Sequence, residues 1–142
     1  MALTSEATTL WRGELATGTG TISLDSSEAA EFPVTWTSRS EGETGRTNPE
    51  ELIAAAHSSC YAMAFSNILA KAGTPPESIQ VTSAVTFDPA NGGITGSHLL
   101  VSAVIPGISE DDFHERAEEA KANCPVSRAL AGIEITLEAS LA

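Results

Sequence analysis

The sequence has 142 residues, enough for one domain with a substantial core, so we predict a single domain over residues 1–142. Hydrophobic residues make up 42% of the chain, which argues against disorder. Nineteen acidic residues against seven basic ones give a net charge of −12. Because such a surface repels nucleic acid and anionic membranes, we expect neither as a partner.

The first twenty residues lack the basic and apolar regions of a secretory signal, so we expect a cytoplasmic protein. Three strands are predicted next, over residues 8–17, 19–25 and 34–39, followed by a polar loop over 40–46. Alternation along the third strand places Arg39 opposite Trp36. This arginine must therefore leave the strand, or cross a chain boundary, to reach a buried site.

One long helix is predicted from Pro49 to Ala72. Asn48 is a natural N-cap, and Glu51 lies three residues later, as a capping-box partner does. Gly73 suits a left-handed C-cap. The helix is apolar on nearly all sides, so we expect it to lie inside the fold or inside an oligomer and not to span a membrane.

The remaining chain predicts a hairpin, a second helix and a last strand. Strands over 78–88 and 94–105 flank the turn sequence ANGG, and Ser109 caps a helix whose apolar stripe directs Cys124 inward. A short helical turn begins at Pro125, and residues 133–141 alternate as a half-buried strand. The order βββ-α-ββ-α-β predicts an α+β fold with antiparallel sheets packed around a long buried central helix.

The only two cysteines are Cys60, in HSSCY, and Cys124, in NCPV. In a reducing cytoplasm a pair of cysteines is more often catalytic or redox-active than joined in a structural disulfide. Three interpretations stay open: inert core thiols, a structural disulfide, or two halves of one reaction. A free thiol is only about 3% ionised at pH 7, and Cys124, directly before a helical turn, is better placed for ionisation than Cys60 in mid-helix.

Other groups indicate few further chemistries. His57 lies three residues before Cys60, so the two are a candidate nucleophile–base pair, although a lone histidine is more often a hydrogen-bonded core residue. No C-x-x-C motif is present, which disfavours a general disulfide oxidoreductase. The three histidines lack metal-ligand spacing, two distant cysteines do not make a zinc site, and no phosphate loop is present. We therefore expect neither a cofactor nor a metal.

The segment TNPEELIAAAHSSCYAMAFSNILAKAG, together with ANCPVSRAL, resembles the OsmC branch of the OsmC/Ohr family of organic hydroperoxide reductases. The similarity extends from WRGELATGTGT to ITLEASL, nearly the whole chain. The resemblance implies an OsmC-like fold and an intertwined homodimer with two active sites near the subunit interface. An oligomer also agrees with the apolar helix, which a monomer of this size would struggle to cover.

The resemblance also implies a mechanism. Cys60 matches the peroxidatic cysteine, whose thiolate reduces an organic hydroperoxide to an alcohol, and Cys124 matches the resolving cysteine, which closes an intramolecular disulfide. An external dithiol then reduces that disulfide. Arg39 matches the arginine that activates thiolate and peroxide, with Arg46 as a second arginine near the motif, and Glu50 matches the glutamate that orients the arginine.

Two alternatives remain. One is a cysteine hydrolase that uses Cys60 and His57 and has no need of Cys124. The other is a non-catalytic stress or binding protein whose cysteines are structural.

Overall fold

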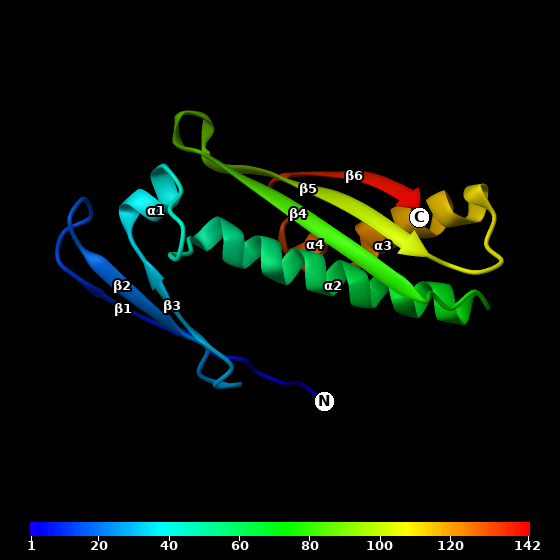
Figure 1. Cartoon of the computed structure of the whole chain (residues 1–142), viewed down its shortest axis with the longest axis horizontal. Coiled ribbons are helices and arrows are strands. Elements are labelled where there is room, and N and C mark those ends of the chain that lie inside the picture. The colour runs from blue at the N-terminus through cyan, green and yellow to red at the C-terminus, as the bar shows by residue number, and fades with distance from the viewer. The chain divides into compact units, whose positions relative to one another are not determined.

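The computed structural model describes residues 1–142, which form two compact units, Met1–Leu52 and Ile53–Ala142. Figure 1 labels their helices and strands. Helix α2 (Pro49–Lys71) begins in the first unit and continues through the second. The single domain over residues 1–142 stays a prediction.

The N-terminal unit contains an antiparallel sheet of β1 (Thr8–Arg12), β2 (Thr19–Ser23) and β3 (Glu31–Val34), in that order. A side chain at Gly20 would bring its Cβ to 2.8 Å from both the Trp11 ring and Val34 Cγ1. Glycine is therefore required where these two side chains meet over β2.

The strand predicted over residues 34–39 is wrong beyond Val34, because helix α1 (Trp36–Ser40) follows. Thr35 Oγ1 accepts a hydrogen bond from the Ser38 N–H at 3.0 Å, and Ser38 Oγ accepts one from the Thr35 N–H at 3.0 Å. This capping box overrides the strand propensity of the threonine and tryptophan residues. Arg39 consequently lies in the last turn of a helix.

The long helix α2 matches its prediction to within one residue at its C-terminal end. Asn48 Oδ1 accepts from the Glu51 N–H at 2.8 Å, as an N-cap does, while the Glu51 carboxylate accepts from the Thr47 hydroxyl at 2.5 Å instead of completing a capping box. Past the helix end, Gly73 has φ +86°, the left-handed conformation expected there.

Within one chain, α2 is buried along a single stripe. Of the two predicted locations, inside the fold or inside an oligomer, the first therefore holds only for this stripe, and the second stays a prediction. His57, Tyr61, Phe65 and Leu69 are fully buried at four-residue spacing, whereas the Met63 side chain is 69% exposed. By length and composition α2 is also apolar enough to cross a membrane, but core helices of water-soluble proteins meet that criterion too.

The C-terminal unit has a sheet of three strands in the order β4-β5-β6. As predicted, β4 (Ser78–Asp88) and β5 (Gly93–Val104) form an antiparallel hairpin, joined by the short 3-10 helix η1 (Pro89–Asn91). The predicted last strand, β6 (Glu134–Leu141), pairs with β5 in parallel, so the prediction of purely antiparallel sheets is wrong. Parallel strands need a long crossover, and α3 (Glu110–Asn123) followed by α4 (Pro125–Ala129) provides it.

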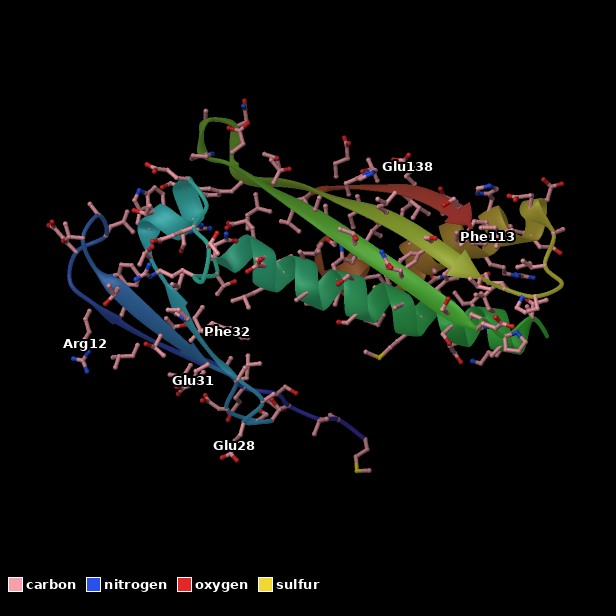
Figure 2. All side chains as sticks on the ribbon, viewed as in Figure 1. Arg12, Glu28, Glu31, Phe32, Phe113 and Glu138 are labelled. Carbon is pink, nitrogen blue, oxygen red and sulfur yellow. The ribbon has the colours of Figure 1, made fainter.

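The core of this unit lies where α2 and α3 pack on the sheet (Figure 1). Phe65 on α2 lies between two other rings, with centroid distances of 5.7 Å to Tyr61 and 5.9 Å to Phe113. Figure 2 labels Phe113. Cys124 belongs to the same buried cluster, so the prediction that it points inward is confirmed.

Candidate functional site

The two cysteines meet in the C-terminal unit. Cys60 lies in the middle of α2, and Cys124 joins the end of α3 to the start of α4. Both are free thiols, and the Cys60 side chain forms a hydrogen bond with that of Cys124. The two side chains therefore lie next to each other, as a disulfide between them would require.

Burial distinguishes the two thiols. Cys124 is fully buried, whereas Cys60 keeps part of its surface accessible, so a peroxide reaches Cys60 more readily. The pKa of Cys60 is raised, first by burial and then by the hydrogen bond with Cys124, while a hydrogen bond with the Val126 backbone acts in the opposite direction. Since the thiolate is the reactive form, Cys60 needs a further stabilising charge to react quickly at neutral pH.

Arg39 and Glu50 form an ion pair in the N-terminal unit. Arg39 Nε and Nη2 donate to Glu50 Oε1 at 3.0 and 2.8 Å. The Glu50 side chain is 6% exposed and that of Arg39 31%. Both donors converge on one carboxylate oxygen, and the other, Oε2, is buried without a hydrogen-bond partner.

Local structure brings the pair together. Ser38 Oγ donates to the Thr47 carbonyl oxygen at 2.7 Å, and Asn48 Nδ2 donates to the Ser38 carbonyl oxygen at 3.1 Å. These bonds hold the end of α1 against the start of α2, the two segments that carry Arg39 and Glu50.

The second arginine near the motif has a different environment. Arg46 Nη1 lies 2.6 Å from Glu43 Oε1, with side chains 44% and 34% exposed. A pair this exposed is weak and screened by salt. Arg39, whose partner is buried, is therefore better suited to hold a fixed position.

His57 is fully buried, and serine hydroxyls occupy both of its ring nitrogens. Nδ1 lies 2.6 Å from Ser97 Oγ, and Nε2 lies 2.8 Å from Ser127 Oγ. Burial lowers the pKa of His57, which favours the neutral ring. With both nitrogens occupied, His57 is not placed to act as a base for Cys60, which argues against the cysteine hydrolase.

The sequence favoured a hydrogen-bonded core histidine over a base at position 57 but indicated neither of its partners. Ser97 lies on β5, and Ser127 lies on α4. No motif signals that serines this distant in sequence face one imidazole, so only the folded chain reveals the network.

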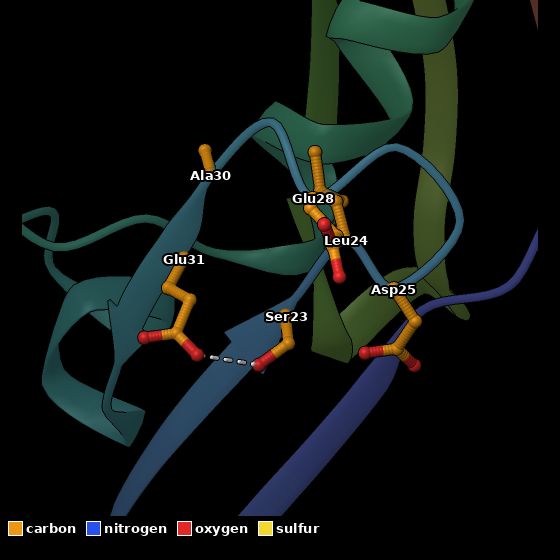
Figure 3. Close-up of a pocket in the computed structure, with 6 residues that line it drawn as sticks. All are labelled: Ser23, Leu24, Asp25, Glu28, Ala30 and Glu31. Carbon is orange, nitrogen blue, oxygen red and sulfur yellow. Dashed lines mark hydrogen bonds between the residues drawn. The ribbon is translucent and has the colours of Figure 1, made fainter.

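Two hollows occur in the N-terminal unit. One, of about 200 Å³, is mainly apolar; its lining comprises Thr9, Trp11, Leu15, Ile22, Val34, Thr35, Trp36, Arg39 and Pro49. The other, of about 650 Å³, is shown in Figure 3; its lining comprises Ser23, Leu24, Asp25, Glu28, Ala30 and Glu31. Neither lining includes a thiol, but only the apolar hollow includes a cation, Arg39, so it is the better candidate for binding the organic part of a peroxide.

Comparison with known proteins identifies relatives across almost the whole chain. Residues 41–138 match the family model described as OsmC-like protein. Peroxiredoxin OsmC of Escherichia coli (strain K12) is 43% identical over 133 residues, which cover 92% of each chain.

Solved structures agree in fold. An organic hydroperoxide resistance protein OsmC from Legionella pneumophila superposes with a TM-score of 0.78 at 23% identity, covering 99% of this chain and 98% of that one. An organic hydroperoxide resistance protein from Elizabethkingia anophelis superposes with a TM-score of 0.76 at 29% identity, covering 100% and 99%.

Proposed function

Because the chain belongs to the OsmC-like family and is a peroxidase, we propose that it reduces organic hydroperoxides to alcohols through Cys60 and Cys124. The observation that carries this proposal is the hydrogen bond between two free thiols in a chain that has no other cysteine. Two sulfurs in contact, one accessible and one buried, suit a peroxidatic and a resolving role, respectively.

The reaction takes two steps on the enzyme. The Cys60 thiolate attacks the terminal peroxide oxygen, the O–O bond breaks, and the alkoxide leaves and takes a proton to become the alcohol. Cys60 is then a sulfenic acid. The Cys124 thiolate attacks the Cys60 sulfur, an S–S bond forms, and hydroxide leaves and is protonated to water. An external dithiol reduces the disulfide and restores both thiols.

Arg39 is proposed to activate the thiolate and the peroxide. The raised pKa of Cys60 creates the need for such a group, and a cation within a few Å lowers a thiol pKa by about 1–3 units. Glu50 is proposed to orient the guanidinium through its two hydrogen bonds. The activating role of Arg39 requires its guanidinium to come within a few Å of the Cys60 sulfur.

An organic substrate is favoured over hydrogen peroxide. The hollow beside Arg39 presents two indole rings, those of Trp11 and Trp36, to a ligand. An alkyl or aryl group gains free energy by leaving water for such a surface, and hydrogen peroxide has no such group.

We also propose a homodimer in a reducing cytoplasm. The exposed Met63 lies on a helix that is apolar on nearly all sides, and a second copy of the chain would cover that face. The net charge of −12 favours neither nucleic acid nor an anionic membrane as a partner. Light scattering across a dilution series tests the dimer, and a monomer at every concentration would reject it.

The function is tested by titrating the reduced protein with cumene hydroperoxide and, separately, with hydrogen peroxide, while counting free thiols. We expect two thiols lost per chain and a Cys60–Cys124 disulfide by mass spectrometry, formed faster with the organic peroxide. Slow or absent oxidation would reject the proposal. It would favour the alternative of a non-catalytic stress or binding protein whose cysteines are structural.

A further inference from the structure

Three polar contacts join α2 to the segment from Cys124 through α4. The Cys60 side chain forms one of them with the Val126 backbone. The remaining two are arranged in parallel. One is the hydrogen bond between the Cys60 and Cys124 side chains. The other is the 2.8 Å contact between His57 Nε2 and Ser127 Oγ. On α2 the histidine precedes Cys60 by three residues, and on α4 the serine follows Cys124 by three residues, so each spacing is about one helical turn.

The imidazole is also fixed from a third side. His57 Nδ1 contacts Ser97 Oγ on β5 at 2.6 Å, and Ser97 Oγ contacts Ser83 Oγ on β4 at 2.9 Å. A buried ring held at both nitrogens cannot turn without leaving polar groups unpaired. The ring therefore fixes the position of Ser127, and with it α4, relative to α2 and the sheet.

Helix α4 needs such support. It has five residues, too few to form a stable helix by itself. Its N-cap is Cys124, the residue whose sulfur must reach Cys60 when the disulfide closes.

We propose that His57 is a positioning residue for the resolving step, keeping Cys124 beside Cys60 while the sulfenic acid waits for attack. The proposal rests on the proposed function. Serine hydroxyls are the hydrogen-bond partners of both ring nitrogens, so His57 acts on the chemistry through Ser127 and α4.

Competition at the sulfenic acid makes this role measurable. The Cys124 thiolate can displace hydroxide and close the disulfide, or a second hydroperoxide can oxidise the sulfenic acid to a sulfinic acid and release another alcohol. Poor positioning of Cys124 slows only the first of these reactions. The yield of sulfinic acid relative to disulfide therefore reports positioning, and the rate of initial thiol oxidation reports activation.

Two replacements of His57 separate its two contacts. In His57→Gln the side-chain amide lies near the position of Nε2, so the hydrogen bond to Ser127 can still form. In His57→Asn the amide lies near the position of Nδ1, so only the hydrogen bond to Ser97 can form. Ser127→Ala removes the α4 contact with a smaller change to the core. Ser83→Ala is the matched control, because it removes a hydroxyl from the same network without touching the histidine or α4.

Reduced proteins are mixed with increasing cumene hydroperoxide, initial oxidation is followed by stopped flow, and products are quantified by mass spectrometry. For His57→Asn and Ser127→Ala we expect the sulfinic-to-disulfide ratio to rise about five- to tenfold, with the initial rate within about twofold of wild type. His57→Gln and Ser83→Ala should stay near the wild-type ratio. If His57→Asn does not fold, Ser127→Ala carries the test.

If Ser127→Ala gives the wild-type ratio of sulfinic acid to disulfide, the positioning role is overturned. The same holds if its rate of initial thiol oxidation falls by the same factor as its rate of disulfide closure. Equal ratios in the glutamine and asparagine variants of His57 overturn it too. If the wild-type protein consumes hydroperoxide without forming the Cys60–Cys124 disulfide, the proposed function fails, and this proposal fails with it.

Discussion

Replacing Glu50 by glutamine tests how the Arg39 guanidinium is held. Glutamine keeps the volume of the side chain and one carbonyl oxygen for the two donors, but it removes the charge. The carboxylate is almost completely buried and accepts bonds of 3.0 and 2.8 Å on a single oxygen. The variant therefore changes the electrostatics of this pair with little change in packing.

The loss of stability follows from the geometry. A hydrogen bond to a charged acceptor contributes about 1.5–3 kcal/mol, and one to a neutral acceptor contributes about 0.5–1.5 kcal/mol. The two bonds share one oxygen, and the Arg39 side chain is 31% exposed, so their contributions do not add fully. We expect a net loss of about 1–2 kcal/mol, which lowers the melting temperature by about 3–8 °C.

The loss of activity should be larger than this destabilisation can explain. A domain with a free energy of unfolding of at least about 5 kcal/mol stays more than about 99% folded after losing 2 kcal/mol. If Glu50 orients the guanidinium that lowers the Cys60 pKa, a shift of one pKa unit reduces kcat/KM about tenfold. The assay is consumption of cumene hydroperoxide with excess dithiothreitol, beside thermal unfolding followed by circular dichroism.

Glu43→Gln is the matched control, because it removes the charge of the exposed Arg46–Glu43 pair while keeping a side-chain oxygen for the 3.3 Å bond from Thr35 Oγ1. A surface pair contributes about 0.2–1 kcal/mol, so we expect a small change in melting temperature and unchanged kcat/KM. If Glu50→Gln is folded and retains at least half of the wild-type kcat/KM, the orienting role of Glu50 is refuted. If Glu43→Gln loses as much activity, the effect is not specific to the buried Arg39–Glu50 pair, and the assignment to Arg39 loses its support.

Three further predictions concern the remaining parts of the site. Cys124→Ser should lose turnover yet still consume one thiol per chain, and a variant that turns over normally would remove Cys124 from the mechanism. Trp36→Ala should raise KM for cumene hydroperoxide by about tenfold without changing the rate with hydrogen peroxide, since only the organic group is bound by apolar burial; equal effects on both would refute the binding role. Burial lowers the pKa of His57 from its ordinary 6.5, so the unfolded chain binds the proton more tightly, and the free energy of unfolding should fall as pH drops below about 6.5. Urea titrations at about pH 7 and pH 5.5 should show a smaller fall in His57→Gln, and an equal fall would assign the effect to other groups.

Local signals in the sequence predicted most of the elements, and non-local pairing explains much of what they missed. The cap at Asn48 and the turn at Gly73 set the ends of α2 because both act within a few residues. The α1 helix was missed since its capping box pairs Thr35 with Ser38, which is neither glutamate nor glutamine, inside a segment of strand-forming residues. Parallel pairing of β6 depends on which strand accepts the crossover through α3 and α4, and alternation within β6 carries no information on its direction.

The candidate site was predictable in a similar way. The resemblance indicated both cysteines, Arg39 and Glu50, and it implied the pairs Cys60–Cys124 and Arg39–Glu50. Residue identity alone could not indicate which groups meet. The contact between the Cys60 and Cys124 side chains and the two serine partners of His57 arise only when the crossover folds against α2.

The two compact units carry different parts of the proposed chemistry. The Arg39–Glu50 ion pair lies within Met1–Leu52, whereas both sulfurs and the His57 network lie within Ile53–Ala142. Activation lowers the barrier to attack on the peroxide, and positioning lowers the barrier to disulfide closure, so the two steps depend on different supporting residues although Cys60 takes part in both. Changes at Glu50 should therefore slow initial oxidation without raising the sulfinic-to-disulfide ratio. Changes at Ser127 should raise that ratio and leave the rate of initial oxidation nearly unchanged. A double variant at Glu50 and Ser127 should combine the two effects independently, because these two side chains share no hydrogen-bond partner.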